Sequence, residues 1–136
     1  DKYLHEVPLK EGVHEFLEGC RERGILLGIA TSNSRQLVEN IADVHGLHNF
    51  FQCIMTGCEV DRGKPAPDIY LKVARILDVD PSECLVFEDI VAGIQAGKSA
   101  GMRVCAVEDV YSADTRETKK ALADHYIETF RGLWNE

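Results

Sequence analysis

The sequence predicts an α/β fold in which a parallel sheet carries helices on both faces, a three-layer, Rossmann-like arrangement. Short apolar runs alternate along the chain with longer amphipathic segments, as they do in right-handed β-α-β crossovers. The apolar run at residues 84–87 ends abruptly in two carboxylates, Glu88 and Asp89, and a segment of small residues follows them. Such a run is typical of a buried parallel strand that ends at the edge where open α/β sheets bind ligands.

Length and composition indicate one globular domain over residues 1–136. The chain is 45% hydrophobic and shows neither an internal repeat nor an interdomain linker. Its 23 acidic and 15 basic residues give a net charge of -8, which argues against binding to nucleic acid or to an anionic membrane. Neither a membrane-spanning apolar run nor a signal-peptide pattern occurs in the sequence. We therefore expect a cytoplasmic protein with no nucleic-acid partner and no membrane partner.

The cysteines predict reduced thiols in a core rather than disulfides or a zinc site. Their number is odd, no Cys-x-x-Cys spacing occurs, and each lies within or beside an apolar segment. They are Cys20, Cys53, Cys58, Cys84 and Cys105. His45 and His48 are spaced like metal ligands, but no cysteine pair or further histidine lies nearby in the sequence, so a role at a helix end is the better interpretation.

The first third of the chain predicts a helix, a strand and a second helix. Apolar residues at helical spacing lie between Pro8 and Gly24, and these are Val13, Phe16, Leu17 and Cys20. Residues 25–30 form an almost wholly apolar run, which predicts a strand buried on both faces. Hydroxyl and amide side chains at residues 31–34 then suit the cap of a helix over residues 37–46.

The middle of the chain predicts a strand at residues 50–56, a polar loop at residues 57–63 and a helix that begins at about Pro67. The prolines after Lys64 and Ala66 hold those two residues out of helical geometry. The residues of this helix that we expect to face the core are Ile69, Val73, Ile76 and Leu77.

The last third begins with the apolar strand at residues 84–88. Glycine and alanine make the following helix, up to residue 101, thin-sided and suited to close packing on a sheet. A strand at residues 103–107, a helix around residues 115–123 and a short edge strand at residues 126–128 complete the predicted domain.

Polar side chains follow three apolar segments of the predicted sheet. They are the hydroxyl and amide groups of Thr31, Ser32 and Asn33, the amine of Lys64, and the carboxylates of Glu88 and Asp89. Because the carboxyl ends of parallel strands meet at one edge, a single crevice can hold all three sets. Phosphoryl transfer uses such a combination: hydroxyl and N–H groups hold phosphate oxygens, a lysine offsets developing charge, and carboxylates hold magnesium.

Each group taken alone has a simpler interpretation. A threonine or serine at this place is usually a helix cap, and a loop lysine is usually solvated. Glu88 and Asp89 would point to opposite sides of a continuing strand, so both reach one ion only if the chain bends there or if one acts through water. The joint order of the groups, rather than any one of them, favours phosphoryl transfer.

The order of three motifs resembles that of the haloacid-dehalogenase-like hydrolases, and is most similar to the β-phosphoglucomutase-like phosphatases and phosphomutases among them. The motifs are Ala-Thr-Ser-Asn at 30–33, Gly-Lys-Pro-Ala-Pro-Asp-Ile-Tyr at 63–70, and Val-Phe-Glu-Asp-Ile-Val-Ala-Gly-Ile-Gln-Ala-Gly at 86–97. The likeness extends from about residue 7 to residue 107.

The resemblance implies a role for each motif residue. The phosphate-binding residues would be Thr31, Ser32, Asn33 and Lys64. Lys64 would also serve catalysis by steadying the nucleophile, and Glu88 and Asp89 would bind Mg²⁺. The family transfers phosphoryl groups of small phosphorylated metabolites through an aspartyl-phosphate.

The sequence departs from this family in one respect. The family's attacking aspartate belongs to an Asp-x-Asp-Gly-Thr-like motif on the first strand, ahead of a helical cap, and no such motif occurs in residues 1–136. Asp78-Val79-Asp80 leads instead into Pro81. We therefore expect a core that is incomplete at its N-terminus, without the nucleophile strand and the cap, and inactive by itself.

In the family's sheet the first strand lies between the strand before Thr31 and the strand before Glu88. We expect an N-terminal segment of the intact protein, or another chain, to supply it, because two strand edges would otherwise stay open. Two functions remain in competition: a magnesium-dependent phosphatase or sugar phosphomutase, and a non-catalytic domain that keeps the phosphate-binding frame. A receiver domain is excluded, because its acidic cluster comes first in the chain and its lysine last.

Overall fold

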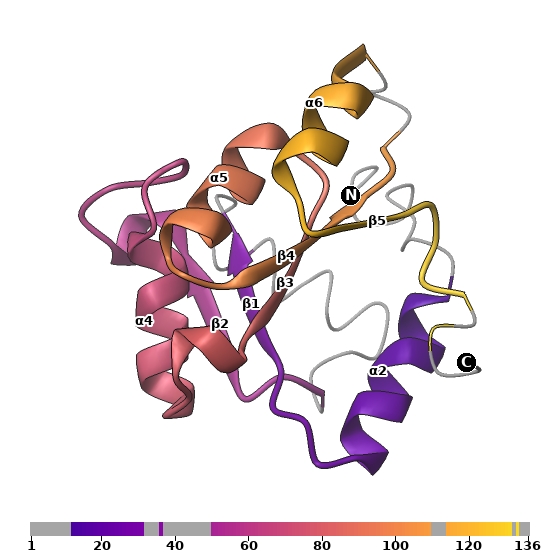
Figure 1. Cartoon of the computed structure of the whole chain (residues 1–136). Helices are drawn as coiled ribbons and strands as arrows, with labels where there is room; N and C mark the ends of the chain where they lie inside the picture. The colour runs from indigo at the N-terminus through magenta and orange to yellow at the C-terminus, as the bar shows by residue number, and fades with distance from the viewer. Residues whose placement is uncertain (1–11, 32–35, 37–49, 110–113, 132, 134–136) are drawn as a thin grey trace.

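The structure is a computed structural model that describes residues 12–31, 36, 50–109, 114–131 and 133, and it has an α/β fold with parallel strands (Figure 1). The strands are β1 (Gly28–Thr31), β2 (Cys53–Thr56), β3 (Leu85–Glu88), β4 (Arg103–Val107) and β5 (His125–Ile127). Strand β1 pairs with β2, and β3, β4 and β5 form a second sheet in that order. All three pairings are parallel, which confirms the predicted fold class.

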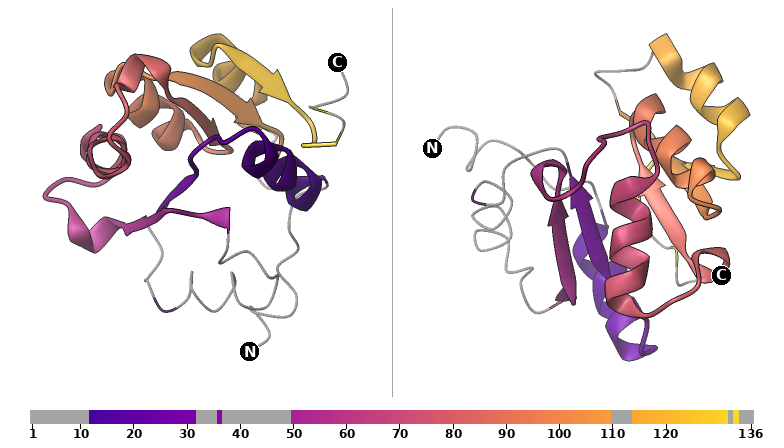
Figure 2. Two further views of the ribbon diagram at one scale, coloured as in Figure 1. Left: turned by 90° about the horizontal axis from the view of Figure 1, so that it is seen from below. Right: turned by 90° about the vertical axis from the view of Figure 1, so that its left-hand side faces the viewer.

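In the described part of the chain, four helices and two short 3-10 turns accompany the strands. They are α2 (Val13–Glu22), α4 (Asp68–Leu77), α5 (Val91–Ser99), α6 (Arg116–Leu122), η2 (Gly57–Glu59) and η3 (Pro81–Glu83). Helix α4 packs on β1 and β2, α5 packs on β3 and β4, and α6 lies against α5 and β5 (Figure 2). Gly28 allows the close approach of α4, since a Cβ at this position would lie 2.8 Å from Val73 Cγ1.

Strand β3 shows how the layers are built. Val86 and Glu88 face α5, where Gly97 and Gly93 leave room for their side chains. Phe87 points to the opposite face and meets Phe16 of α2 edge-on, with ring centroids 5.1 Å apart. Because alternate residues of a strand point to opposite faces, β3 separates a helix on one side from a helix on the other.

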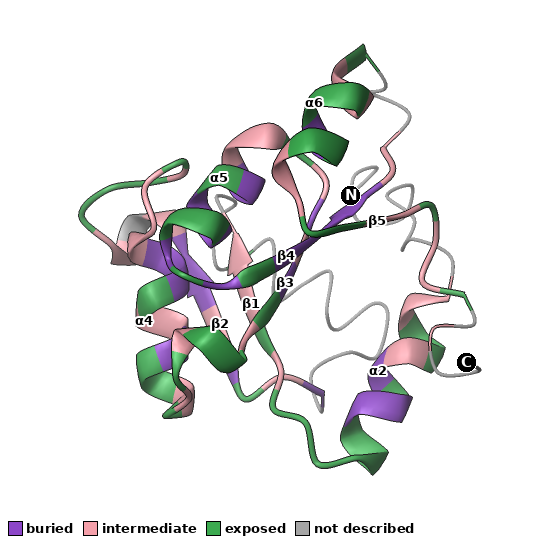
Figure 3. Ribbon diagram, viewed as in Figure 1, coloured by how far each residue is buried: buried purple, intermediate pink, exposed green. Residues whose placement is uncertain are grey.

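The core follows β4. Residues Val104 to Val107 are buried, as are the sheet-facing sides of α4 and α5 (Figure 3). Cys20, Cys53 and Cys105 are buried free thiols and Cys84 is a half-buried one, as the sequence predicts. The side chain of Cys58, both histidines with ligand-like spacing and the predicted helix over residues 37–46 lie outside what the structure describes.

Two details of the predicted packing are wrong. Strand β1 begins at Gly28 and is not buried on both faces: Gly28 is exposed, and the hydrophobic residues before the strand, Ile25 and Leu26, are 43% and 47% exposed. In the described part of the chain β1 pairs along one edge, with β2, and no ladder joins it to β3. The apolar run therefore has less sheet around it than its composition suggested.

In α4, Ile76 is 53% exposed, whereas Tyr70 and Ala74 are buried beside Ile69. Since 3.6 residues make one turn, the buried stripe of a helix that begins at Asp68 lies nearer to positions 70 and 74 than to position 76. No helix among the described residues is long and apolar enough to cross a membrane.

Candidate active site

Lys64 brings the two sheets together at their carboxyl ends. It lies in the loop that leads from η2 into α4, and its side chain is 10% exposed. Its Nζ donates to Glu88 Oε2 at 2.5 Å, at the end of β3, and to the carbonyl oxygen of Ala30 at 3.3 Å, in β1. The amine therefore lies between two strands that have no ladder between them in the described chain.

Glu88 is a buried carboxylate at the last position of β3, 8% exposed. Its Oε2 accepts a second hydrogen bond from the hydroxyl of Tyr70, also at 2.5 Å. Gly93, at the start of α5, makes this position possible, because a Cβ there would overlap the Glu88 carboxylate. Two donors from different segments, the Lys64 ammonium and the Tyr70 hydroxyl, thus hold the carboxylate, and Gly93 of a third segment leaves the space for it.

The hydroxyl of Tyr70 is held in its protonated form. Burial raises the pKa of its hydroxyl well above the ordinary value, and the neighbouring carboxylates of Glu88 and then Asp89 raise it further. The ammonium of Lys64 also lies 5.3 Å from the centre of the Tyr70 ring. The contribution of Asp89 to this pKa indicates that its carboxylate lies in the same electrostatic environment.

The chain bends directly after Glu88. Strand β3 ends there, Ile90 has extended dihedral angles (φ -125°, ψ 153°), and α5 begins at Val91. Half-buried Asp89 lies in this bend, and its main-chain carbonyl accepts a hydrogen bond from Lys119 Nζ at 3.1 Å. The bend that Glu88 and Asp89 need in order to reach one ion is therefore present.

Of the three predicted phosphate-binding residues at 31–33, the structure describes Thr31. Thr31 ends β1, is half-buried, and pairs in register with Thr56 of β2. Ser32 and Asn33 lie outside the described residues. The structure thus brings the end of β1, Lys64 and Glu88 together, and says nothing about the two residues that follow Thr31.

Sequence reasoning missed two residues of this region, Tyr70 and Lys119. A signal existed for Tyr70, since it follows Ile69 and lies four residues before Ala74 on an amphipathic helix. Lys119 carries no such signal: a Lys-Lys pair in a polar helix is usually solvated, yet Lys119 is fully buried.

The residues present fit a magnesium ion. Magnesium usually takes one or two protein carboxylates together with waters and phosphate oxygens, and Glu88 and Asp89 supply two carboxylates. Within the described chain, buried Glu88 uses Oε2 for both of its hydrogen bonds and Oε1 for none. The described residues contain no cluster of three or more histidine, cysteine or acidic side chains that could hold a metal without a substrate or a further segment.

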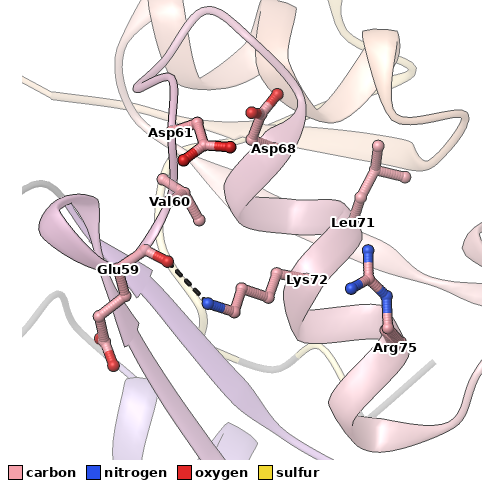
Figure 4. A pocket seen from close by; sticks show the side chains of 7 residues that line it. All are labelled: Glu59, Val60, Asp61, Asp68, Leu71, Lys72 and Arg75. Atoms are coloured by element: carbon pink, nitrogen blue, oxygen red, sulfur yellow. Dashed lines mark hydrogen bonds between the residues drawn. The ribbon is translucent and has the colours of Figure 1, made fainter.

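A hollow beside α4 is a different feature from this site. It measures about 300 Å³ and is lined by Glu59, Val60, Asp61, Asp68, Leu71, Lys72 and Arg75 (Figure 4). The amine of Lys72 donates to the carbonyl of Glu59 across it, at 2.7 Å. Neither Lys64 nor Glu88 lines it.

The chain belongs to the haloacid dehalogenase-like hydrolases, because the model of that family matches residues 1–107. Among its curated relatives is hexitol phosphatase B of Escherichia coli, 35% identical over 100 residues that cover 74% of this chain and 45% of the relative. Two solved structures are similar as well. CbbY from Rhodobacter sphaeroides in complex with phosphate has a TM-score of 0.85 and 32% identity, with 96% of this chain and 59% of that chain covered. A putative β-phosphoglucomutase from Thermotoga maritima has a TM-score of 0.82 and 32% identity, with 92% and 57% covered.

The chain therefore spans about half the length of these relatives. The family matches the one that the motifs resemble, and the relatives include both a named phosphatase and a putative phosphoglucomutase. The predicted family is thus confirmed.

Proposed function

We propose that this chain is the core of a magnesium-dependent phosphatase or sugar phosphomutase that acts on a small phosphorylated metabolite in the cytoplasm. The observation that carries the proposal is the position of Lys64, whose amine joins the end of β1 to the carboxylate at the end of β3. A phosphoryl group bound at this edge would have a buried cation beside it and hydroxyl and N–H donors after β1.

Lys64 would stabilise the negative charge of the transferring group. Its ammonium is held by Glu88 and the Ala30 carbonyl, so little side-chain motion has to be lost when a substrate binds. Thr31, Ser32 and Asn33 would donate to the phosphate oxygens from the start of the following segment.

Glu88 and Asp89 would hold the magnesium ion, Asp89 from the bend after β3 and Glu88 through the face not used by Lys64. A bound magnesium ion polarises a phosphoryl oxygen and neutralises part of its charge. Among the chain's own residues, Tyr70 keeps Glu88 oriented through its hydroxyl, and Gly93 provides the space that this orientation needs.

The attacking carboxylate would come from a further strand between β1 and β3, supplied by an N-terminal segment or by another chain. The separation of these two strands into different sheets supports this, as does the exposure of Leu26, two residues before β1, and of Leu85, the first residue of β3, at 47% and 49%. Attack on the phosphate ester would form an aspartyl-phosphate, which water or a sugar hydroxyl then cleaves.

The relatives support the substrate class. One is named a hexitol phosphatase, and a structure of CbbY from Rhodobacter sphaeroides contains xylulose-1,5-bisphosphate. Both names point to small phosphorylated sugars or sugar alcohols. We propose the same broad class of substrate for this protein.

The test is an assay of a generic phosphate ester, with and without magnesium, on the chain extended upstream or mixed with its upstream segment. We expect magnesium-dependent activity that is lost in Lys64→Ala and Asp89→Asn, whereas Lys72→Ala on α4 keeps it. Asp89→Asn should weaken magnesium binding more than Thr31→Ala does. An upstream segment without an Asp-x-Asp motif would instead favour a non-catalytic phosphate-binding domain, and activity indifferent to both substitutions would contradict the roles given to Lys64 and Asp89.

A further inference from the structure

Lys119 is a fully buried lysine on α6 that the proposed chemistry does not use. Its exposed fraction is 0%, although its neighbour Lys120 on the same helix is exposed. It also lies beyond residue 107, where the match to the family model ends. Burying an ammonium is unfavourable unless good partners compensate it, so the position of Lys119 calls for an explanation.

The ammonium of Lys119 reaches the bend after β3. It donates to the main-chain carbonyl of Asp89 at 3.1 Å, 30 residues away in the sequence. It also lies near the end of β4: hydrogen bonds from Arg116 and Tyr126 are the main causes that lower the pKa of Glu108, and the charge of Lys119 lowers it further. Lys119 is therefore a cation among chain segments that leave the carboxyl ends of β3 and β4.

The bend matters because of the order Glu88-Asp89. Side chains of consecutive strand residues point to opposite faces, and Glu88 already points towards α5 and Lys64. Asp89 can bind the same ion directly only if the chain turns out of the strand direction at this residue. The Asp89 carbonyl lies in that turn, and it accepts the hydrogen bond from Lys119.

We propose that Lys119 is a positioning residue for the metal site: its ammonium anchors the Asp89 carbonyl and so sets the orientation of the Asp89 carboxylate. This inference rests on the proposed function, because it takes Asp89 to be a metal ligand. It also gives α6 a role in the site, although α6 contributes no side chain to the phosphate.

The change in metal affinity when Lys119 is removed separates this positioning role from two simpler roles, a nearby charge and a structural attachment of α6. A cation close to a divalent ion repels it, so if Lys119 acted only as a nearby charge, its removal would strengthen metal binding. If Lys119 only attached α6 to the sheet, its removal would lower stability and leave metal binding by the folded protein unchanged. Positioning predicts weaker metal binding, by about tenfold, the lower end of the usual effect of groups that orient metal ligands.

The experiment compares Lys119→Met with Lys120→Met, a matched control one residue further along, whose ammonium lies over the ring of Tyr126 at 5.0 Å. On the chain joined to its upstream segment, we measure Mn²⁺ binding by calorimetry, thermal unfolding, and the NMR shifts of the Asp89 carbonyl carbon and the Ile90 amide nitrogen for each variant, with Asp89→Asn as the reference. Methionine has a similar length and suits a buried site, so the fold should survive. If Lys119→Met does not fold, the same measurements are made on Lys119→Gln, which keeps a neutral hydrogen-bond donor at this position.

We expect Lys119→Met to weaken Mn²⁺ binding about tenfold and to shift both NMR signals, with a smaller loss for Lys119→Gln and none for Lys120→Met. Unchanged or tighter Mn²⁺ binding in the folded Lys119 variants, while Asp89→Asn abolishes it, would overturn the inference and leave the proposed function standing. If Asp89→Asn has no effect on Mn²⁺ or the chain binds none, the proposed metal site fails. The inference that Lys119 positions a metal ligand then fails with it.

Discussion

The two sheets of this chain differ in how far their strands are surrounded. In the three-stranded sheet β4 has a partner on each edge, and its last four residues are buried. In the two-stranded sheet β1 pairs only with β2 among the described strands, and no residue of β1 is fully buried. The fold therefore has two halves that differ in burial. In the covered half, β3, β4 and β5 with α5 and α6, the central strand is buried and paired on both edges. In the open half, β1 and β2 with α4, the strand β1 is only partly buried.

The candidate site lies where these halves meet. Lys64 and Tyr70 belong to the open half, and both donate to Glu88 of the covered half. Strands β1 and β3 share no ladder in the described chain, so these side chains replace backbone pairing as the polar link between the sheets. Changes at the site should therefore affect stability as well as chemistry.

The largest loss of unfolding free energy should come from removing the Lys64 ammonium from its ion pair with Glu88. Lys64→Met leaves the buried Glu88 carboxylate without its cation, and loss of one partner of a buried ion pair costs about 3 kcal/mol of unfolding free energy. Urea unfolding measures it. Lys98→Met is the control, because Lys98 pairs with Asp124 on the surface, where its side chain is 41% exposed. Equal losses in the two variants would show that the buried pair does not join the halves.

A methyl group at position 93 should have the next largest effect. Gly93→Ala forces the Glu88 carboxylate away from Lys64 and Tyr70, and overpacking of this kind costs about 2 kcal/mol. The matched control is Gly63→Ala, since nothing lies within 4 Å of a Cβ at that position. Thermal unfolding of both variants measures the difference, and a Gly93→Ala protein as stable as Gly63→Ala would contradict the described geometry.

Removing the Tyr70 hydroxyl should have a smaller effect that depends on pH. Tyr70→Phe deletes a hydrogen bond to a charged group, worth about 1.5 kcal/mol, while Lys64 still holds Glu88. Because folding raises the pKa of Tyr70, chiefly through burial, the tyrosine's contribution is complete below its ordinary pKa near 10. It declines as the pH rises above that value.

Urea unfolding of both proteins at pH 8 and at pH 10.5 measures this pH dependence. The gap between wild type and Tyr70→Phe should narrow at the higher pH. A gap that is constant, or that widens, would mean that Tyr70 is not held in its neutral form.

The smallest expected effect is a difference in amide hydrogen-exchange rate between β4 and β1 in the unmodified protein. The amides of Val104 to Ala106 in β4 should exchange more slowly than those of Ile29 and Ala30 in β1, because β4 is buried and paired on both edges. Mass spectrometry or NMR follows both sets in one sample. Equal protection would remove the distinction between a covered and an open half.

The sequence predicted the parts of the site that depend on chain order. The apolar run into Glu88, the lysine before Pro65 and the start of α4 next to Pro67 are local patterns, and each lies where the pattern indicated. Together they were enough to predict the fold class, the family and a common edge for Lys64 and Glu88.

The remaining details depend on contacts that local patterns do not contain. The hydroxyl of Tyr70 meets Glu88 through the rotation of α4, and that same rotation exposes Ile76. Lys119 is buried on α6, where its ammonium reaches the Asp89 carbonyl 30 residues away in the sequence. The exposure of β1 depends on which strands flank it, and composition alone suggested full burial.

The most direct test of the central claim, that Lys64 and Glu88 act as one unit across the two halves, is a double-mutant cycle. Unfolding free energies are measured for Lys64→Met, Glu88→Gln and the double variant. The account predicts a coupling energy of about 2 kcal/mol, so that the double variant is more stable than the sum of the single losses implies. A coupling energy near zero, with the two losses simply adding, would contradict it.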